Sequence, residues 1–185
     1  MQVDRLSGIV AAVWSLGFAA VSGWQLISGP GKGTAYAAFA TGLAVMISLV
    51  LVLKLAGAVL AVAAIVPSRL GLPVRLTAMG LWGAFGLLAL YCAGSVVIAV
   101  GTASGAVGPS AAWTAAGGIT GRSLWYLLFN LVGATAFGLL AFGFHRRHRL
   151  RWTVAVVGLV GAPLLLALVL GVGPAILGAL GLLPA

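Results

Sequence analysis

Lys54 is the residue of this sequence best placed for chemistry, because it interrupts a long apolar run between Leu53 and Leu55. A lysine at the centre of a membrane helix costs about 2.5–3.5 kcal/mol on insertion scales, so such residues often serve a function. If the span is about 46–66, Lys54 lies near the midplane; if it is about 37–58, Lys54 lies near the cytoplasmic face and extends to the interface. A structural anchor and a ligand or anion site therefore both stay open.

Polar residues near the middles of other apolar runs could accompany Lys54: Tyr91, Ser95, Asn130 and Thr135. No carboxylate within these runs can neutralise the lysine, which therefore either loses its proton or binds an anionic group such as a lipid phosphate. We predict a candidate ligand-binding site at Lys54, Tyr91 and Asn130. For Asn130 a structural hydrogen bond between helices competes with this role, since such bonds average about 0.6 kcal/mol. We expect Lys54→Met to leave folding intact, or to improve it, and to remove any binding of an anion or lipid.

The segment 145–151 holds four arginines and two histidines. Arginines next to a membrane span attract anionic headgroups, and each charge contributes on the order of 1 kcal/mol. Docking of a specific lipid or protein is the alternative. Metal binding by His145 and His148 is disfavoured, because the adjacent arginines repel a cation. We expect contact with anionic headgroups on the cytoplasmic side from Arg146, Arg147, Arg149 and Arg151.

Acidic and thiol groups are almost absent, since Asp4 is the sole acidic residue and Cys92 the sole cysteine. General acid–base catalysis usually needs a positioned His, Asp or Glu, and hard-metal sites need clustered oxygen ligands. Proton-coupled pumps typically use acidic residues or His within the membrane. We therefore expect no enzyme activity, no proton-driven carrier, no metal and no cofactor. Packing explains Cys92 better than reactivity, because a reactive thiol needs an accessible, electropositive setting.

The composition identifies the elements that must position these residues. Of 185 residues, 63% are hydrophobic and only 6% are charged, whereas soluble domains carry about 25% charged residues. This excludes a soluble globular protein and predicts an all-α membrane protein. The net charge of +9 does not indicate nucleic-acid binding, because the basic residues lie in short turns between apolar runs.

We predict a single domain over 1–185, a bundle of about five transmembrane helices. The first span is longer than the apolar part of a signal peptide, which is about 7–15 residues. The second is long for an upright span and either tilts or begins at the interface. We expect 102–121 to form an exposed loop, and 172–185 either to extend the last helix or to lie at the interface. The predicted spans are about 6–27, 37–66, 76–101, 123–144 and 152–171.

The basic residues are distributed unequally between the two sides that five spans would create. Cytoplasmic segments carry an excess of Lys and Arg, so the N-terminus is predicted to be cytoplasmic and the C-terminus outside. The abundance of Arg, Ala and Gly indicates a high-GC bacterial genome and thus a bacterial cell membrane. The opposite side holds Lys32 and Arg122. The amino-terminal side holds Arg5, Arg69, Arg75, Arg146, Arg147, Arg149 and Arg151.

Glycines recur every third residue at Gly80, Gly83 and Gly86. Small residues let membrane helices approach closely, so we interpret these glycines as helix-packing positions. A nucleotide-binding fingerprint would need a preceding strand and a βαβ unit.

Three stretches of the sequence resemble a known family. They are 12–22, which runs into Trp24; Leu53–Ala58, ahead of a Pro-Arg turn; and 121–129, ahead of the arginines. Together they resemble a family of small actinobacterial multi-helix membrane proteins that carry a domain of unknown function. The family pattern of the third stretch has an acidic residue and a proline after the tryptophan, where this chain has Tyr126 and Leu127. The resemblance covers most of 6–152 and implies a fold and a membrane location, without an established activity.

Two hypotheses for function follow. The first is a non-enzymatic accessory or interaction protein that packs against lipid, another membrane protein or a second copy of itself. The second is a small carrier or binding protein for a lipid or apolar molecule whose anionic group contacts Lys54. A cavity around Lys54, Tyr91 and Asn130 would favour the second hypothesis. A filled bundle with Lys54 at the cytoplasmic edge would favour the first.

Overall fold

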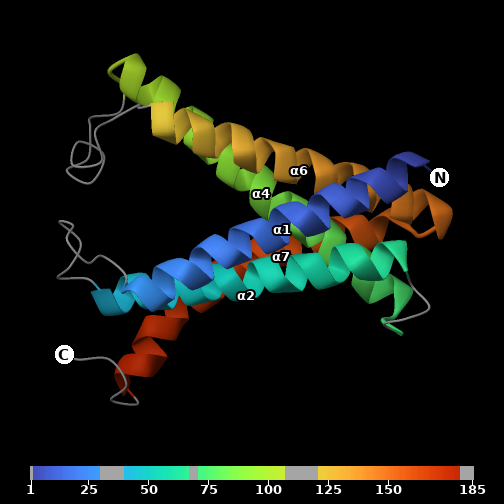
Figure 1. Ribbon diagram of the computed structural model, residues 1–185, viewed down its shortest axis with the longest axis horizontal. Helices are drawn as coiled ribbons and strands as arrows, with labels where there is room; N and C mark the ends of the chain where they lie inside the picture. Colours follow the sequence, from blue (N-terminus) through green and yellow to red (C-terminus); the bar gives the residue numbers. More distant parts are fainter. Residues whose placement is uncertain (1, 30–39, 67–70, 107–120, 180–185) are drawn as a thin grey trace.

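The described part of the protein is helical. The computed structural model describes residues 2–29, 40–66, 71–106 and 121–179, with side chains over 4–29, 41–66, 71–106 and 124–172 (Figure 1). Each of its five helices contains a stretch long and apolar enough to cross a membrane. This confirms the expected all-α fold, and the five candidate spans in the described residues indicate a multi-pass membrane protein. The helices are α1 (Gln2–Ser28), α2 (Ala40–Ile65), α4 (Val74–Ala103), α6 (Gly121–Arg147) and α7 (Trp152–Ala179).

The apolar runs form helices because lipid offers no partners to backbone polar groups, which must then bond within the segment. Glycine ends two of them in the left-handed conformation that commonly follows a helix C-terminus. Gly29 follows α1 with φ 89°, and Gly105 lies beyond the end of α4 with φ 73°. Pro73 stands immediately before α4. The local sequence thus sets where these spans stop.

Several boundaries differ from the predicted ones. Helix α1 begins at Gln2, and α6 continues to Arg147, so His145 lies in a helix rather than in the predicted turn. Helix α7 continues to Ala179 and thereby includes the first part of the undecided segment 172–185. Of the predicted loop, 102–103 belong to α4, and 107–120 lie outside the described residues.

The helices converge at one end and diverge at the other (Figure 1). Helix α1 packs along α2, α4 packs along α7, and α6 packs against both α4 and α1. The N-terminus, the end of α6 and the start of α7 lie together at what we call the basic end. Toward the opposite end, here called the open end, α7 separates from α4 and α6. The described arginines at the basic end are Arg5, Arg75, Arg146, Arg147, Arg149 and Arg151.

Glycines bring helix backbones together in the convergent half. A Cβ at Gly86 would lie 2.8 Å from the backbone oxygen of Leu159, and one at Gly158 would meet backbone atoms of α4. Gly80 and Gly83 likewise face side chains of α2 and α7. These contacts confirm that the glycines spaced three apart in α4 are helix-packing positions.

An ion pair joins α1 and α6 at the basic end. The Arg147 guanidinium donates a hydrogen bond to the Asp4 carboxylate over 2.9 Å, and Gly143 lies against that carboxylate. The start of α1 is thereby joined to the end of α6. Arg146, Arg147 and the other arginines of the segment 145–151 are exposed, as headgroup contact requires.

His145 differs from the expectation of a residue in a cytoplasmic turn. It is 3% exposed, and its ring packs against Trp82 of α4 and Trp152 of α7, with centroids 6.3 and 4.6 Å away. Both of its ring nitrogens and Trp82 Nε1 are buried and have no hydrogen-bond partner within the described residues. The histidine is therefore part of the packed contact between three helices.

Candidate functional site

Lys54 lies near the middle of α2. It stands 14 residues after Ala40 and 11 before Ile65, which places it about 21 and 17 Å from the two helix ends. Side chains of a helix tilt toward its N-terminus, and in α2 that terminus lies at the open end (Figure 1). Lys54 thus lies at mid-helix and points away from the basic end.

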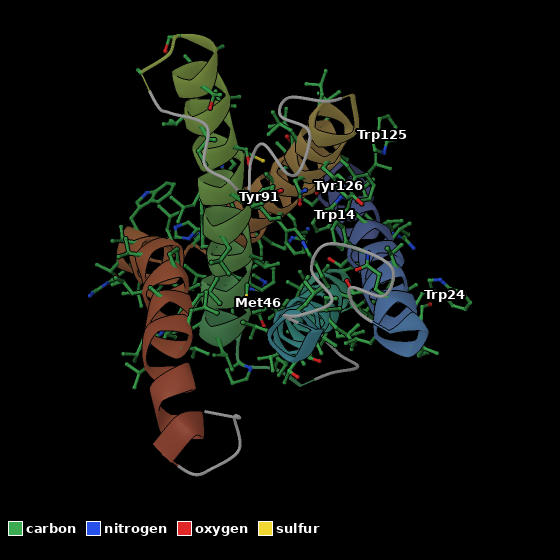
Figure 2. The ribbon with its side chains drawn as sticks, turned by 90° about the vertical axis from the view of Figure 1, so that its left-hand side faces the viewer. Trp14, Trp24, Met46, Tyr91, Trp125 and Tyr126 are labelled. Carbon is green, nitrogen blue, oxygen red and sulfur yellow. The ribbon has the colours of Figure 1, made fainter. Side chains whose placement is uncertain are left out.

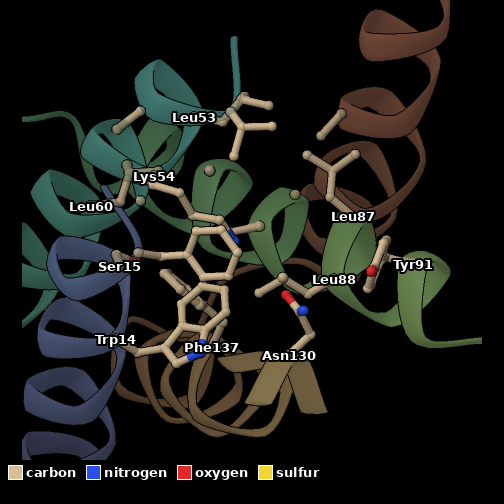
Figure 3. Close-up of a pocket in the computed structure, with 18 of the residues that line it drawn as sticks. Trp14, Ser15, Leu53, Lys54, Leu60, Leu87, Leu88, Tyr91, Asn130 and Phe137 are labelled. Carbon is tan, nitrogen blue, oxygen red and sulfur yellow. The ribbon is translucent and has the colours of Figure 1, made fainter. Parts of the chain in front are cut away.

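An aromatic pair on α1 holds the Lys54 ammonium. Its Nζ lies 3.8 Å from the centroid of the Trp14 ring and 4.8 Å from that of Phe18. Trp14 and Phe18 are four residues apart and share one helix face. Figure 3 shows the lysine side chain extending over the Trp14 indole. A cation–π interaction of this kind contributes about 0.5–2 kcal/mol, more when water is excluded.

The Trp14 ring is itself fixed against α6. Its Nε1 donates a hydrogen bond to the backbone oxygen of Phe129 over 2.8 Å. Its ring also contacts those of Phe129 and Phe137, with centroids 5.6 and 6.5 Å away. A Cβ at Gly133 would lie 2.6 Å from the indole, so glycine is what lets the ring approach α6. The aromatic support of the lysine is therefore built from both α1 and α6.

A cavity of about 620 Å³ lies beside Lys54 and is lined by residues of all five described helices. Its wall is mostly apolar. The polar residues that line it are Ser15, Lys54, Tyr91, Tyr126 and Asn130. The three residues of the predicted ligand site therefore line one cavity.

The lysine has no anionic partner among the described residues. Asp4, the only acidic side chain of the sequence, pairs with Arg147 at the basic end. Among the described residues, no hydrogen bond or ion pair is made by the Lys54 ammonium. A charge held in an apolar setting without a counter-charge is costly, and the aromatic rings offset only part of that cost.

Ser15 adds a second unpaired polar group. It is 1% exposed, and its hydroxyl has no hydrogen-bond partner in the described part of the chain. It follows Trp14 directly on α1 and lies on the same side of the cavity as Lys54 (Figure 3). A hydroxyl of this kind can donate to a bound oxygen.

Asn130 does not form the predicted bond between helices. Its Nδ2 donates over 2.8 Å to the backbone oxygen of Tyr126, one turn earlier in α6. Asn130 is 6% exposed, and Figure 3 shows its amide directed toward the cavity. Because one amide N–H bonds within α6, the rest of the amide group faces the cavity and bonds no neighbouring helix among the described residues.

Tyr91 lies across the cavity from Lys54 and at its rim, with 52% of its surface exposed. The other two suggested partners are not part of the site. Ser95 donates to the backbone oxygen of Tyr91 in its own helix, and Thr135 is exposed outside the cavity lining. Cys92 is buried, in agreement with a packing role.

Aromatic side chains mark the open end. Trp24 and Trp125 are largely exposed and point away from the bundle (Figure 2). From the sequence, Trp24, Tyr36, Trp125 and Tyr126 are expected to mark this interface; Tyr36 lies outside the described residues. Within those residues, no group of three or more His, Cys, Asp or Glu could hold a metal ion.

The sequence interpretation missed Trp14, Ser15 and Phe18 as site residues. The signal was a tryptophan and a phenylalanine at helical spacing near the middle of α1. Assigning them to the lysine required knowing that α1 packs against α2.

Comparisons with known proteins find no matching family model, no similar curated protein and no similar solved structure. The resemblance to the actinobacterial family stays an expectation from the sequence. The function is therefore inferred from the cavity and its residues.

Proposed function

We propose that the protein is an intramembrane binding protein for an apolar molecule whose anionic group contacts Lys54. The observation that carries this proposal is a lysine at mid-helix that lines a cavity of about 620 Å³ and has no counter-charge among the described residues. Binding sites of about 300–1,000 Å³ with apolar walls and a few polar groups are typical of sites for one small molecule.

The charge of the site supports an anionic ligand. A monoanion bound to the ammonium would supply the missing counter-charge and accept its hydrogen bonds. An apolar wall would at the same time cover the rest of the ligand. The proposal involves binding without catalysis, in keeping with the single acidic side chain of the sequence.

We also propose that the basic end faces the cytoplasm of a bacterial cell membrane. Six described arginines gather at that end, as expected from the excess of basic residues in cytoplasmic segments. A periplasm-dependent reporter fused to the C-terminus is then active, while a cytoplasm-dependent reporter is inactive. The reverse result would contradict this orientation.

Native mass spectrometry of the protein from phosphatidylcholine nanodiscs tests binding. Palmitic acid and phosphatidic acid serve as two anionic probes. We expect at least one of them to bind the wild type at one molecule per chain and to bind Lys54→Met more weakly. The control is Lys32→Met, which removes the only other lysine of the sequence and is expected to bind like the wild type.

Equal binding of both probes by wild type and Lys54→Met would overturn the proposed function. The accessory-protein hypothesis would then account better for the chain. No observation in the described residues specifically supports that hypothesis now.

A further inference from the structure

We propose that the ligand is a single-chain amphiphile with one carboxylate, a free fatty acid in chemical class, and that it enters from the open end of the bundle. This inference rests on the proposed function and narrows its ligand. Four features carry it: the count of charges, the depth of the lysine, the polar groups of the wall and the divergence of the helices.

The charge count favours a monoanion. The site contributes one ammonium and no acidic side chain. A carboxylate cancels that charge, whereas a phosphate monoester carries about −1.5 to −2 at neutral pH and would leave a net negative charge in an apolar cavity. Uncompensated buried charge is strongly unfavourable.

The depth of Lys54 disfavours ordinary membrane lipids. Lipid headgroups lie at the surface of a hydrocarbon core about 30 Å thick, roughly half that distance from its centre. A two-chain phospholipid would have to bring its phosphate and ester groups to mid-helix to meet the lysine. A fatty acid brings only one carboxyl group, and its chain can follow the apolar wall.

The polar groups of the wall suit the two oxygens of a carboxylate. The Lys54 ammonium has N–H donors that the aromatic rings leave free for a ligand, and the Ser15 hydroxyl is unpaired. Asn130 presents its amide to the same cavity (Figure 3). The other lining residues are predominantly apolar, among them Leu53, Leu87 and Leu88.

The route follows from the shape of the bundle. Close contacts join α4 to α7 and to α6 in the half near the basic end, where Gly80 and Gly83 also form part of the cavity wall. Toward the open end the helices diverge (Figure 1), and the cavity rim there includes the exposed side chain of Tyr91. A chain attached to a carboxylate at Lys54 would therefore extend toward the open end, where α2 and α4 separate.

The test compares ligands that share a chain and differ in the headgroup. Palmitic acid, its methyl ester, cetyl alcohol, lysophosphatidic acid and phosphatidic acid are titrated into phosphatidylcholine nanodiscs that hold the wild type. We expect palmitic acid to bind tightest. Lys54→Met should weaken palmitic acid about 10- to 100-fold and leave the alcohol and the ester nearly unchanged, since hydrogen bonds to charged groups contribute about 1.5–3 kcal/mol.

Two further variants test the contribution of the Ser15 hydroxyl and the need for free volume in the cavity. Ser15→Ala should weaken palmitic acid about 2- to 10-fold, the effect of one neutral hydrogen bond. Ala84→Phe fills part of the cavity wall and should weaken all chain-bearing ligands alike, with Gly94→Ala, a position in open space on the same helix, as the control.

The outcomes distinguish the two proposals. Lys54-dependent binding of phosphatidic or lysophosphatidic acid in preference to palmitic acid would overturn the carboxylate inference and leave the proposed function standing. Equal binding of the acid, the ester and the alcohol by wild type and Lys54→Met would overturn both. Palmitic acid binding that Ala84→Phe leaves unchanged would overturn the assignment to this cavity.

Discussion

The two halves of the bundle differ in how closely their helices pack. Near the basic end, glycines bring the backbones of α4 and α7 into contact, and His145 is enclosed by two tryptophans. In the middle and toward the open end, the helices diverge around a cavity that holds a lysine (Figures 1 and 3).

This difference in packing assigns stability mainly to the convergent half and ligand binding to the cavity. Closely packed small residues stabilise membrane helices mainly through van der Waals contact, and the convergent half has these contacts. The cavity loses them, and Lys54 adds the cost of a charge. We therefore expect substitutions in the convergent half to change stability, and those around the cavity to change binding.

The largest effect is expected from Gly158→Ala in the convergent half. The new Cβ would meet the backbone oxygen of Met79 and lie 2.9 Å from Trp82 Cβ, so α4 and α7 must separate. We expect a loss of about 3 kcal/mol, the upper end of the range for overpacking. The matched control is Gly161→Ala, in the same helix with open space around it. Thermal unfolding in detergent measures both; equal melting temperatures for the two variants would contradict the tight α4–α7 contact.

Lys54→Met should sharpen the contrast by stabilising the fold. Removal of a mid-membrane lysine stabilises the fold by about 2.5–3.5 kcal/mol on insertion scales. Loss of its cation–π interaction with the aromatic pair destabilises the fold by about 0.5–2 kcal/mol. The net gain is about 2 kcal/mol, measured as a higher unfolding midpoint in ligand-free detergent. A lower midpoint would mean that the lysine is a structural element of the bundle.

A double-mutant cycle between Trp14 and Lys54 measures the contact that supports the ammonium. Trp14→Leu removes the ring beneath Nζ, so it should destabilise the wild type more than it destabilises Lys54→Met. The expected coupling is about 0.5–2 kcal/mol. Trp24→Leu, at an exposed tryptophan on the same helix, should show no coupling with Lys54.

The smallest effect is expected from Asp4→Asn at the basic end. Its ion pair with Arg147 is partly exposed, and such pairs contribute about 0.2–1 kcal/mol. The loss should shrink in high salt, since screening weakens exposed pairs. A loss of several kcal/mol that salt does not alter would show that the carboxylate acts through buried contacts instead.

The number and approximate position of the helices followed from the sequence because each span is a long apolar run bounded by Gly, Pro or Arg. The boundaries at 145–147 did not, since the charged residues there suggested a turn, whereas His145 continues α6 and packs against tryptophans. Charge pattern shows which side of the membrane a segment faces but not whether its helix has ended.

Lys54 was recognised in the sequence as the unusual residue, and Tyr91 and Asn130 were placed near it by their positions in the runs. Its depth required the bounds of α2, because an apolar run of that length allows two registers. Trp14 and Phe18 could not be assigned from periodicity, since all faces of such helices are apolar. Their role depends on which helices are neighbours.

The hydrogen bond from the Trp14 indole to Phe129 links positions 115 residues apart, and this has a consequence for biogenesis. Helices that enter the bilayer in order leave Trp14 without its acceptor until the fourth of them, α6, has arrived. In a chain truncated before that helix, the Trp14 ring would lack the hydrogen bond and the ring contacts with α6 that fix it beneath Lys54. Ligand capture would therefore begin only late in assembly, and a bound ligand would mark a chain whose insertion has reached α6.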